Sequence, residues 1–380
     1  MCNVLVIIDP RRRISVNDIG TIERHLIYSR NLYSKSNGTI CKIVVLQPIK
    51  KGEEEQIVID STLSIFRVNF LKVIINFRKN VFHEFINFGF KPVLVVAGDP
   101  WESSWCALRF RKIGLKNGLN IPIQIQVHAE MSKNWSNASL VNRFRSMLTS
   151  RTFAKSSRIR ATSASQKSLL VSRFGADESL IDVLPVPLSL ISEEIMIFNE
   201  HRPFSIGFVG RIQKERDLKL FAEVCRKIAS VNSELKVVII GDGNSRESFI
   251  TELKKSISFE NIECLGYLNG LDLERSWAKI GVLLSTAPNE SYGRSIRESL
   301  MHGIPVLARN SMGVDSLRME APHNWIRVLD PKMNAEELSK EFLDLQCLET
   351  TDEYLKKQNS FQVKVVEDLV STWIEMSINP

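Results

Sequence analysis

Short, continuous apolar runs alternate along the chain with longer stretches in which apolar residues recur at helical spacing. Continuous runs of this kind are typical of strands that are covered on both faces of a sheet. The predicted strands of the first half are 4–8, 41–46, 70–77, 91–98, 121–127 and 159–165, and those of the second half are 204–210, 235–243, 262–268, 280–287, 304–310 and 325–329.

Amphipathic stretches between these runs predict helices, among them 21–33, 218–230, 245–256 and 335–346. Strand and helix therefore alternate in both halves of the chain, which predicts two doubly wound, Rossmann-like α/β domains. Open sheets of this class bind ligands at the carboxyl ends of their strands, so two such domains predict a central cleft that both of them face.

The domain boundary is predicted where prolines interrupt the pattern, between 185 and 203, before a new strand begins at Phe204. A length of 380 residues fits two domains. We expect an N-terminal domain at 1–190 and a C-terminal domain at 200–355. A last helix at 360–380 is a candidate to pack back on the N-terminal domain.

The composition is that of a soluble globular protein, with 44% hydrophobic and 24% charged residues, and it excludes disorder and low complexity. No apolar run approaches the roughly 18–20 residues that a helix needs to cross a bilayer. The first apolar run precedes the nearest basic residues, which is the reverse of the order in a signal peptide. Six scattered cysteines without a CxxC pair are typical of a reducing compartment. We therefore expect a cytoplasmic protein.

Positive charge is concentrated in the first half of the chain. The net charge is +7, with 27 basic and 17 acidic residues in 1–200 against 23 and 26 in 201–380. Between Trp101 and Arg173, 13 basic residues accompany only Glu102 and Glu130. Such an excess favours an anionic partner, which could be a membrane surface, a phosphorylated acceptor or nucleic acid. Solvated helix faces are the alternative interpretation.

The most informative segment is APNESYGRSIRESLMHGIPVLA, in which a strand ends, a short loop follows and a helix begins. Glu290 falls in the loop, and Glu298 falls about two turns into the helix. The backbone N–H groups of Tyr292, Gly293 and Arg294 at the helix start are suited to an anion. Carboxylates on either side of a phosphate site suit a sugar nucleotide. The alternative is one acid that favours the helix dipole and one surface glutamate.

Two arginines follow an upstream strand, in SIGFVGRIQKERDLKLFAEV. Arg211 and Arg216 could neutralise a pyrophosphate, because the guanidinium group binds phosphate oxygens in a bidentate manner. A solvated basic turn is the alternative. Gly241 and Gly243, in IIGDGNSRESF, predict a tight turn between a strand and a helix, but the segment lacks the GxGxxG pattern of a dinucleotide site.

These motifs, in their order and spacing, resemble the C-terminal domain of retaining glycosyltransferases of family 4, which have the GT-B fold. The likeness covers about 203–320 and includes GFVGRIQKERDLKLF, IIGDGNSRESF, IECLGYL and the two-glutamate motif with its Gly-Ile-Pro-Val. In the first half, DIGTIERHL is similar to the family's glycine-containing loop and first helix, and VHAE is similar to its histidine loop.

The resemblance implies roles for the residues of the second half. Arg211 and Arg216 would bind the donor diphosphate, with Arg216 standing where the family commonly has Lys. Glu290 would contact the sugar near the reacting carbon, and Glu298 would bind the ribose. The backbone of 292–294 would hold phosphate. Ser291-Tyr292 replaces the family's commoner Gly-Phe, which is a mild change, and Met312-Gly313 and Ser316 stand where the family often has a double glycine and a Glu. Together these departures leave the donor open.

In the first half, the resemblance implies that His128 hydrogen-bonds the donor sugar and that Gly20 lets an N-terminal loop close over the phosphates. A histidine beside a strand is otherwise commonly structural. Asp99 and Glu102 could orient an acceptor hydroxyl, although a loop that caps the following helix is the favoured interpretation. His302 is assigned to packing.

The sequence therefore predicts a metal-independent, retaining glycosyltransferase that moves a sugar from a nucleoside diphosphate to an acceptor hydroxyl, in glycan, glycolipid or cell-surface polysaccharide synthesis. No Asp-x-Asp pair occurs, and no cofactor beyond the donor substrate is expected. The acceptor would be a sugar, a lipid-linked molecule or another hydroxyl compound, and peripheral attachment to a membrane stays open. A sugar-nucleotide epimerase, a sugar phosphorylase and a non-catalytic binding protein are the alternatives. Nucleic acid is not expected, because the basic stretch lacks the interleaved aromatics of stacking platforms.

Overall fold

The computed structural model describes residues 1–68, 82, 85–129, 131–137, 139–188, 202–290, 292–322, 324–349 and 352–378. The predicted strand 70–77, Glu130 and Ser291 lie outside the described residues. The chain divides into two compact units, Met1–Pro187 with Val363–Pro380, and Leu188–Gln362.

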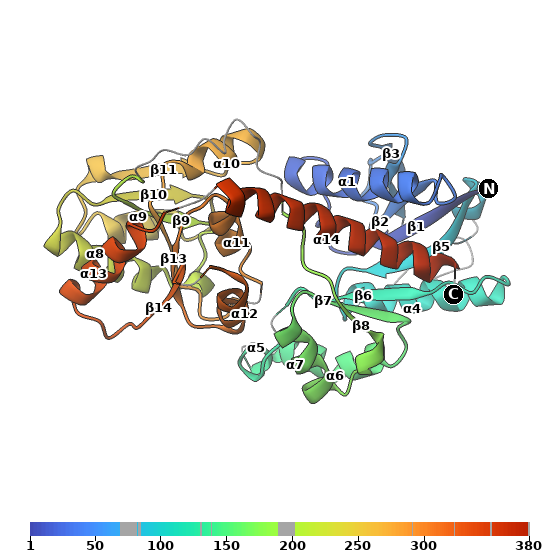
Figure 1. Cartoon of the computed structure of the whole chain (residues 1–380). Coiled ribbons are helices and arrows are strands. Elements are labelled where there is room, and N and C mark those ends of the chain that lie inside the picture. The colour runs from blue at the N-terminus through green and yellow to red at the C-terminus, as the bar shows by residue number, and fades with distance from the viewer. Residues whose placement is uncertain are drawn as a thin grey trace. The chain divides into compact units, whose positions relative to one another are not determined.

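The first unit is built on an eight-stranded sheet with the order β3-β4-β2-β1-β5-β6-β7-β8 (Figure 1). All neighbouring strands are parallel except β3, which runs antiparallel to β4 at the edge. The strands are β1 (Cys2–Ile8), β2 (Lys42–Pro48), β3 (Gln56–Val58), β4 (Leu63–Val68), β5 (Phe90–Ala97), β6 (Ile123–Gln126), β7 (Arg158–Ala161) and β8 (Ile181–Val183).

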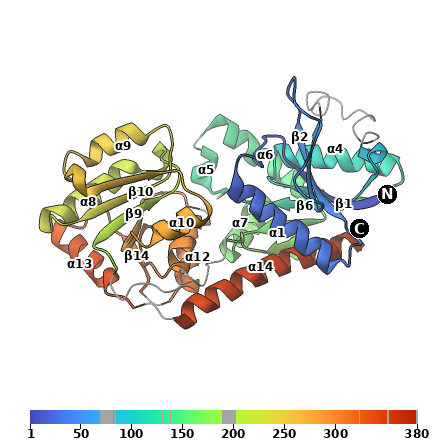
Figure 2. The ribbon, with the colours of Figure 1, turned by 90° about the horizontal axis from the view of Figure 1, so that it is seen from above.

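Helices cover both faces of this sheet. Successive residues of β1 enter different cores: Leu5 joins α1 (Ile19–Lys35) and α14 (Asp352–Ile378), whereas Val6 joins the other face. That other face is covered by α4 (Glu102–Lys116), α6 (Leu140–Phe153) and α7 (Ala164–Phe174), and the short α5 (Lys133–Asn137) precedes α6. α1 and α14 lie side by side, with the rings of Tyr28 and Trp373 5.7 Å apart (Figure 2).

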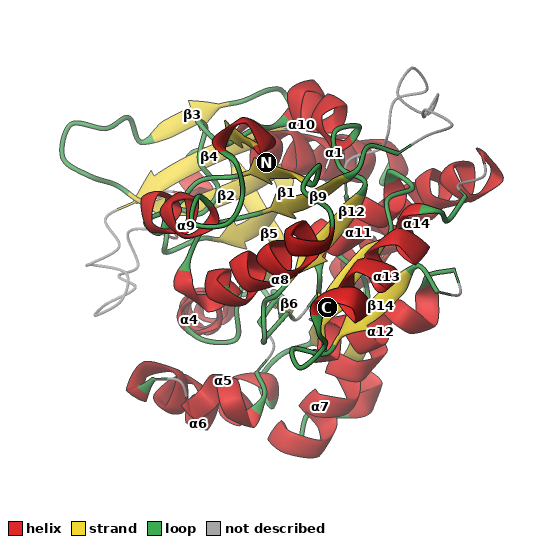
Figure 3. Cartoon of the chain, turned by 90° about the vertical axis from the view of Figure 1, so that its left-hand side faces the viewer, coloured by secondary structure: helices red, strands yellow, loops and turns green. Residues whose placement is uncertain are grey.

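The second unit is built on a six-stranded, fully parallel sheet with the order β11-β10-β9-β12-β13-β14. Its strands are β9 (Ser205–Val209), β10 (Lys236–Ile240), β11 (Ile262–Gly266), β12 (Val282–Ser285), β13 (Val306–Arg309) and β14 (Ile326–Leu329). One face packs on α8 (Leu218–Val231), α9 (Arg246–Leu253) and α13 (Ala335–Gln346), and the other on α10 (Gly270–Trp277), α11 (Arg294–Met301) and α12 (Met312–Glu320) (Figure 3).

The predicted doubly wound α/β architecture is confirmed, and the helix predicted at 335–346 is observed as α13 with those bounds. Its start is well defined because Asn334 and Glu337 form a reciprocal capping box. The last helix is longer than predicted: α14 begins at Asp352, so one continuous helix contributes residues to both units. Among the described residues, every helix is too short or too polar to cross a membrane.

Candidate active site

In the second unit the strand order reverses between β9 and β12, which are neighbours in the sheet but belong to opposite directions of winding. Ligands of open α/β sheets bind at the carboxyl ends of strands at such a switch point. β9 leads through a short 3₁₀ helix, Lys214–Arg216, into α8. β12 leads through the segment from Thr286 to Gly293 into α11. The two motifs singled out in the sequence therefore meet at this edge.

An ion pair joins these two connections. Arg216 Nη1 donates to Glu290 Oε2 at 2.8 Å, and the two side chains are 24% and 13% exposed. Thr286 Oγ1 donates to the backbone carbonyl of Arg216 at 2.8 Å. The other Glu290 oxygen accepts the backbone N–H of Gly293 at 3.1 Å. One carboxylate thus holds both a guanidinium group and the start of α11.

The turn into α11 requires glycine. Gly293 has a φ of +69°, in the left-handed region, and a Cβ there would lie 2.7 Å from Leu317 Cδ1. The preceding Tyr292 is buried, and the Arg297 guanidinium lies 4.4 Å from the centre of its ring. Arg297 Nε also donates to the Tyr292 carbonyl at 3.2 Å. Arg297 of α11 therefore holds the loop that precedes this helix in place.

Glu298 lies within α11, and Glu290 lies before it, as their spacing predicts. Arg294 Nε donates to Glu298 Oε1 at 2.8 Å, and the Glu298 side chain is 14% exposed. At the end of the helix His302 is buried and stacks on Trp277, with ring centres 5.3 Å apart. Burial lowers the pKa of His302 to about 4. The assignment of His302 to packing is confirmed.

The two glycines after β10 shape the loop that carries the arginines. A Cβ at Gly241 would lie 1.9 Å from the carbonyl oxygen of Gly210, and a Cβ at Gly243 would lie 2.4 Å from that of Ile212. The backbone N–H of Ile212 donates to Asp242 O at 2.9 Å. Glycine is therefore needed for close approach of two backbones. Arg211, on this loop, is exposed and forms no ion pair with any residue that the structure describes.

The first unit has its own cavity at the corresponding place, where its strand order reverses between β1 and β5. The cavity has a volume of about 310 Å³ and includes Asp9 after β1, Asp99 after β5 and His128 after β6. Its basic lining residues, which the sequence interpretation did not identify, are Arg11, Arg13, Arg24 and Arg160. The run of three arginines shortly after β1 could have indicated two of these residues, Arg11 and Arg13.

The carboxylates of this cavity are already used by the fold. Asp9 accepts the backbone N–H groups of Arg13 and Ile14 at 3.0 and 2.9 Å. Asp99 accepts the backbone N–H groups of Trp101 and Ser103 at 2.9 and 3.2 Å. Asp99 therefore stabilises the loop and the first turn of α4, as expected of a structural role, although the N-cap position of that helix is Trp101. The cavity is left with an excess of positive charge.

Glu102 forms ion pairs with two arginines of the first unit. It pairs with Arg11 and, at 2.7 Å, with Arg145. Partial burial acts to raise its pKa, but the hydrogen bonds from Arg11 and Arg145 outweigh it and lower the pKa of Glu102 to about 2. Glu102 is therefore an ionised link between three segments of the first unit, and it does not line the cavity.

His128 lies on the cavity wall, and its Nε2 is 3.1 Å from Gln126 Oε1. Although part of the side chain is exposed, enclosure by protein, followed by the charges of Arg160, Arg24 and Arg13, lowers its pKa. The imidazole is therefore neutral near pH 7, and it can donate or accept a hydrogen bond.

Gly20 is not in a loop, contrary to expectation. It lies in the first turn of α1, whose N-cap Asp18 accepts the backbone N–H of Thr21 at 3.1 Å. A Cβ at Gly20 would meet only Asp18 Oδ1, at 3.9 Å. Neither space nor backbone conformation requires a glycine there.

The described part of the chain contains no group of three or more His, Cys, Asp or Glu side chains placed to hold a metal ion. The positive groups near Glu290 are side chains and backbone amides of the protein itself.

Comparison with known proteins bears on the second unit first. Residues 193–360 match the family model described as glycosyl transferases group 1. The GDP-mannose-dependent alpha-mannosyltransferase of Mycolicibacterium smegmatis is 27% identical over 108 residues, which cover 28% of this chain and 26% of that relative.

Two solved structures are similar over nearly the whole chain. A sucrose-phosphate synthase from Thermosynechococcus elongatus has a TM-score of 0.69 at 12% identity and covers 99% of this chain and 97% of its own. HepE from Anabaena, in complex with UDP and glucose, has a TM-score of 0.63 at 16% identity and covers 97% and 98%. At this identity the likeness concerns the fold alone, and it confirms the predicted GT-B fold.

Proposed function

We propose that this protein is a retaining glycosyltransferase of family 4 that moves a sugar from a nucleoside diphosphate to an acceptor hydroxyl. The observation that carries the proposal is the contact of Arg216 with Glu290 at the strand-order reversal of the second unit, inside the matched residues 193–360. The complex of the similar HepE with UDP and glucose supports a nucleotide-sugar donor.

The donor diphosphate would bind at Arg211, Arg216 and the start of α11. In the structure Arg216 and the Gly293 N–H both hold the Glu290 carboxylate. A phosphate that binds there competes for the same two donors. Arg211, which is exposed and lies in the same connection between β9 and α8 as Arg216, would supply a further guanidinium group. Cationic and backbone donors at this position stabilise the charge that develops on the leaving diphosphate.

The two glutamates would act at different parts of the donor. Glu290 is held in the loop before α11, beside the proposed phosphate site, and would therefore contact the sugar near the reacting carbon. Glu298 is fixed by Arg294 further along the helix and would accept hydrogen bonds from the ribose hydroxyls. The protein's contribution to rate would be positioning and stabilisation of charge.

Retention would follow from attack on the same face from which the diphosphate leaves. The bond from the anomeric carbon to the diphosphate oxygen breaks, the acceptor oxygen forms the new bond, and the departing phosphate oxygen takes the acceptor proton. The cavity of the first unit, with neutral His128 on its wall, is proposed to bind the reacting sugar and acceptor. The acceptor would be a sugar, a lipid-linked molecule or another hydroxyl compound of glycan or cell-surface polysaccharide synthesis, and no metal is required.

Thermal unfolding with UDP, GDP and ADP and their sugars tests donor binding. A ligand at about 100 times its dissociation constant adds about 2.7 kcal/mol of stability. We expect the nucleotides of one base to raise the melting temperature of the wild type. Arg216→Gln should lose this increase. Arg318→Gln, at an exposed position of α12, should retain it. Lack of stabilisation by every nucleotide would contradict the proposal.

A turnover assay separates the proposed transferase from its alternatives. Transfer of labelled sugar to an acceptor, or slow donor hydrolysis without one, is expected. Conversion of the donor to an epimer without acceptor would instead identify an epimerase, and release of sugar 1-phosphate by free phosphate would identify a phosphorylase.

A further inference from the structure

Helix α6 exposes apolar side chains. Leu140, Phe144 and Met147, at helical spacings of four and three residues, are 84%, 58% and 64% exposed, and neighbouring Val141 is 57% exposed. Together with Arg143 and Arg151 these residues are named the α6 face. In a helix of a soluble domain the apolar stripe normally faces the core. The α6 face reverses that arrangement.

Polar contacts fix this orientation from the opposite side of the helix. Trp101 Nε1 donates to Thr149 Oγ1 at 3.1 Å, and Thr152 Oγ1 donates to Pro100 O at 2.9 Å. Arg145 pairs with Glu102 at 2.7 Å and lies over the Trp101 ring. Rotation of α6 to bury its apolar residues would break all of these contacts, so the exposure of the α6 face is a consequence of the fold.

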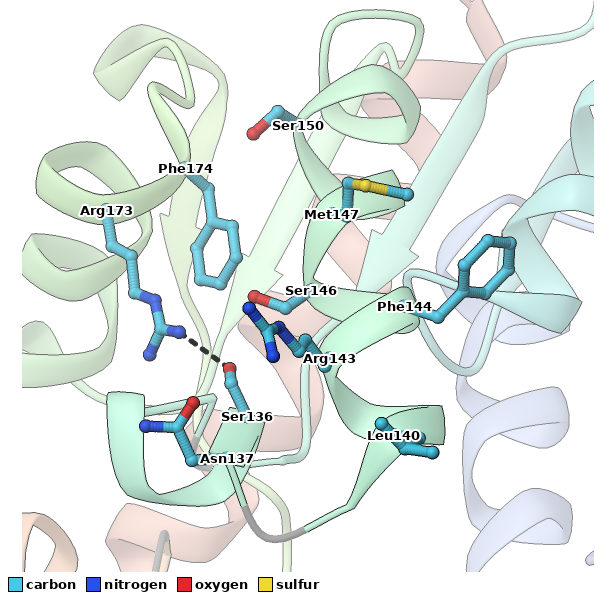
Figure 4. A pocket seen from close by; sticks show the side chains of 10 residues that line it. All are labelled: Ser136, Asn137, Leu140, Arg143, Phe144, Ser146, Met147, Ser150, Arg173 and Phe174. Atoms are coloured by element: carbon cyan, nitrogen blue, oxygen red, sulfur yellow. Dashed lines mark hydrogen bonds between the residues drawn. The ribbon is translucent and has the colours of Figure 1, made fainter.

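A hollow of about 650 Å³ adjoins the α6 face, between α5, α6 and the end of α7 (Figure 4). Two arginines, Arg143 and Arg173, line this hollow. Arg173 is held in place because it donates to Ser136 Oγ at 2.6 Å and to Met131 O at 2.7 Å. Figure 4 shows Arg143 directed toward Ser136, whereas Phe144 points away from Arg173. Basic and apolar groups therefore lie side by side on one surface.

Acidic residues are missing from the sequence around this surface. From Met131 to Arg173 the chain has nine Lys and Arg residues and no Asp or Glu. Lys133, Arg143, Arg151 and Lys155 are exposed. Basic side chains beside protruding Leu, Phe and Met are the composition of a helix that lies in the interface of an anionic bilayer.

We propose that the α6 face docks on an anionic lipid bilayer, with its apolar side chains among the acyl chains and its arginines at the lipid phosphates. A nucleic acid would engage the arginines but leave Leu140 and Met147 without partners. A second copy of this face would oppose basic residues to basic residues. The inference deepens the proposed function, on which it rests, because a bilayer would present a lipid-linked acceptor to the unit that contains the His128 cavity.

Co-sedimentation of the full chain with vesicles tests the proposal. Vesicles of phosphatidylcholine alone are compared with vesicles that contain 30–40% phosphatidylglycerol or cardiolipin, an amount on the order of anionic membranes, at low and high salt. We expect binding to the anionic vesicles that weakens as salt screens it. Equal binding to neutral vesicles, or no binding, would overturn the proposal.

Two sets of substitutions locate the surface. Leu140→Gln, Phe144→Gln and Met147→Gln together should lower vesicle partitioning at least about tenfold, because burial of these side chains is lost. Arg143→Gln with Arg151→Gln should lower it about 30-fold, since each basic residue near anionic lipid contributes about fivefold. The matched control is Leu271→Gln, Phe259→Gln and Met319→Gln in the second unit, where the side chains are 58%, 70% and 88% exposed. Equal loss in the control would overturn the assignment to α6.

The failure of this inference is distinguishable from that of the proposed function. Folding of each variant is checked by its melting temperature, and nucleotide binding by the thermal shift described above. Nucleotide binding without vesicle binding would reject the docking surface alone. Vesicle binding without any nucleotide binding would reject the transferase. Sedimentation velocity shows whether the protein self-associates. If the wild type is a dimer and the triple variant of the α6 face is a monomer, the bilayer proposal is also overturned.

Discussion

Arg216 and Glu290 form an ion pair of 2.8 Å across the carboxyl ends of β9 and β12, although 74 positions separate them in the sequence. Glu290 also accepts the Gly293 N–H. The protein's own carboxylate thus occupies the groups to which we assign the donor diphosphate. Donor binding would have to rearrange this contact, which makes Glu290 the most informative position to change.

Glu290→Gln should lower kcat by more than tenfold with a modest change in donor KM. The amide keeps the size of the side chain but removes the charge that would act near the reacting carbon, and a group that acts mainly in the transition state affects kcat. Steady-state kinetics with the donor identified by thermal shift measure both constants. A variant with wild-type kcat would contradict the role of Glu290.

Glu298→Ala should mainly raise donor KM. Loss of a charged hydrogen-bond partner costs on the order of 1.5–3 kcal/mol, which corresponds to about 10–150-fold. Arg294, its partner in the structure, provides the control: Arg294→Gln frees Glu298 without removing it and should change KM far less. If Glu298→Ala and Arg294→Gln shift KM equally, Glu298 acts by supporting the helix and not by binding the donor.

Much of the fold could be predicted because its strands are buried on both faces and therefore appear as continuous apolar runs. The strand at Val4 and the helix at 335–346 are examples. The edge of the first sheet could not be predicted in this way. β3 has three residues and is antiparallel to β4 at the margin, so it needs no long apolar run. The full length of α14 was also missed, since its first turns are polar.

Local sequence patterns predicted the candidate site only where the positions are close in sequence, and it was the family resemblance that assigned Arg211 and Arg216 to the same donor site as Glu290. The loop with Glu290 and the helix with Glu298 lie within one motif and were located correctly. The contact of Glu290 with Arg216 depends on the strand order, which places β12 beside β9. The contribution of Arg24 to the first cavity depends on the packing of α1, which no local pattern reveals. The presence of a glycine was also a misleading signal for a loop, because Gly20 lies in helix α1.

Chelation should not abolish transfer. The charge of the diphosphate is expected to be balanced by Arg211, Arg216 and backbone amides, and the described residues offer no metal-binding cluster. Initial rates are measured with EDTA and then with added Mg²⁺ or Mn²⁺. A rate that disappears with EDTA and returns with metal would contradict metal independence.

Stability should fall as pH decreases from about 6.5 to about 4, partly because of His302. Burial lowers the native pKa of His302 to about 4, so in this window the unfolded state binds a proton that the native state does not, and the free energy of unfolding decreases. The contribution is on the order of 2–3 kcal/mol over the window. Urea unfolding at several pH values should show a smaller slope for His302→Gln than for wild type. Equal slopes would mean that His302 does not titrate with folding.

Gly293→Ala and Gly20→Ala should have opposite effects on stability. Alanine at Gly293 must adopt a φ of +69° and displace Leu317, whose Cδ1 lies 2.7 Å from the position of the new Cβ. Strain and overpacking of this kind cost about 1–3 kcal/mol, and the start of α11 would move relative to Glu290. Alanine at Gly20 enters a helical first turn with open space, and it should stabilise the protein by about 0.4–1 kcal/mol because the unfolded chain loses freedom. Thermal and urea unfolding measure both variants, and donor binding should weaken only in Gly293→Ala. Tolerance of Gly293→Ala with unchanged donor binding would show that the turn before α11 is not the phosphate site.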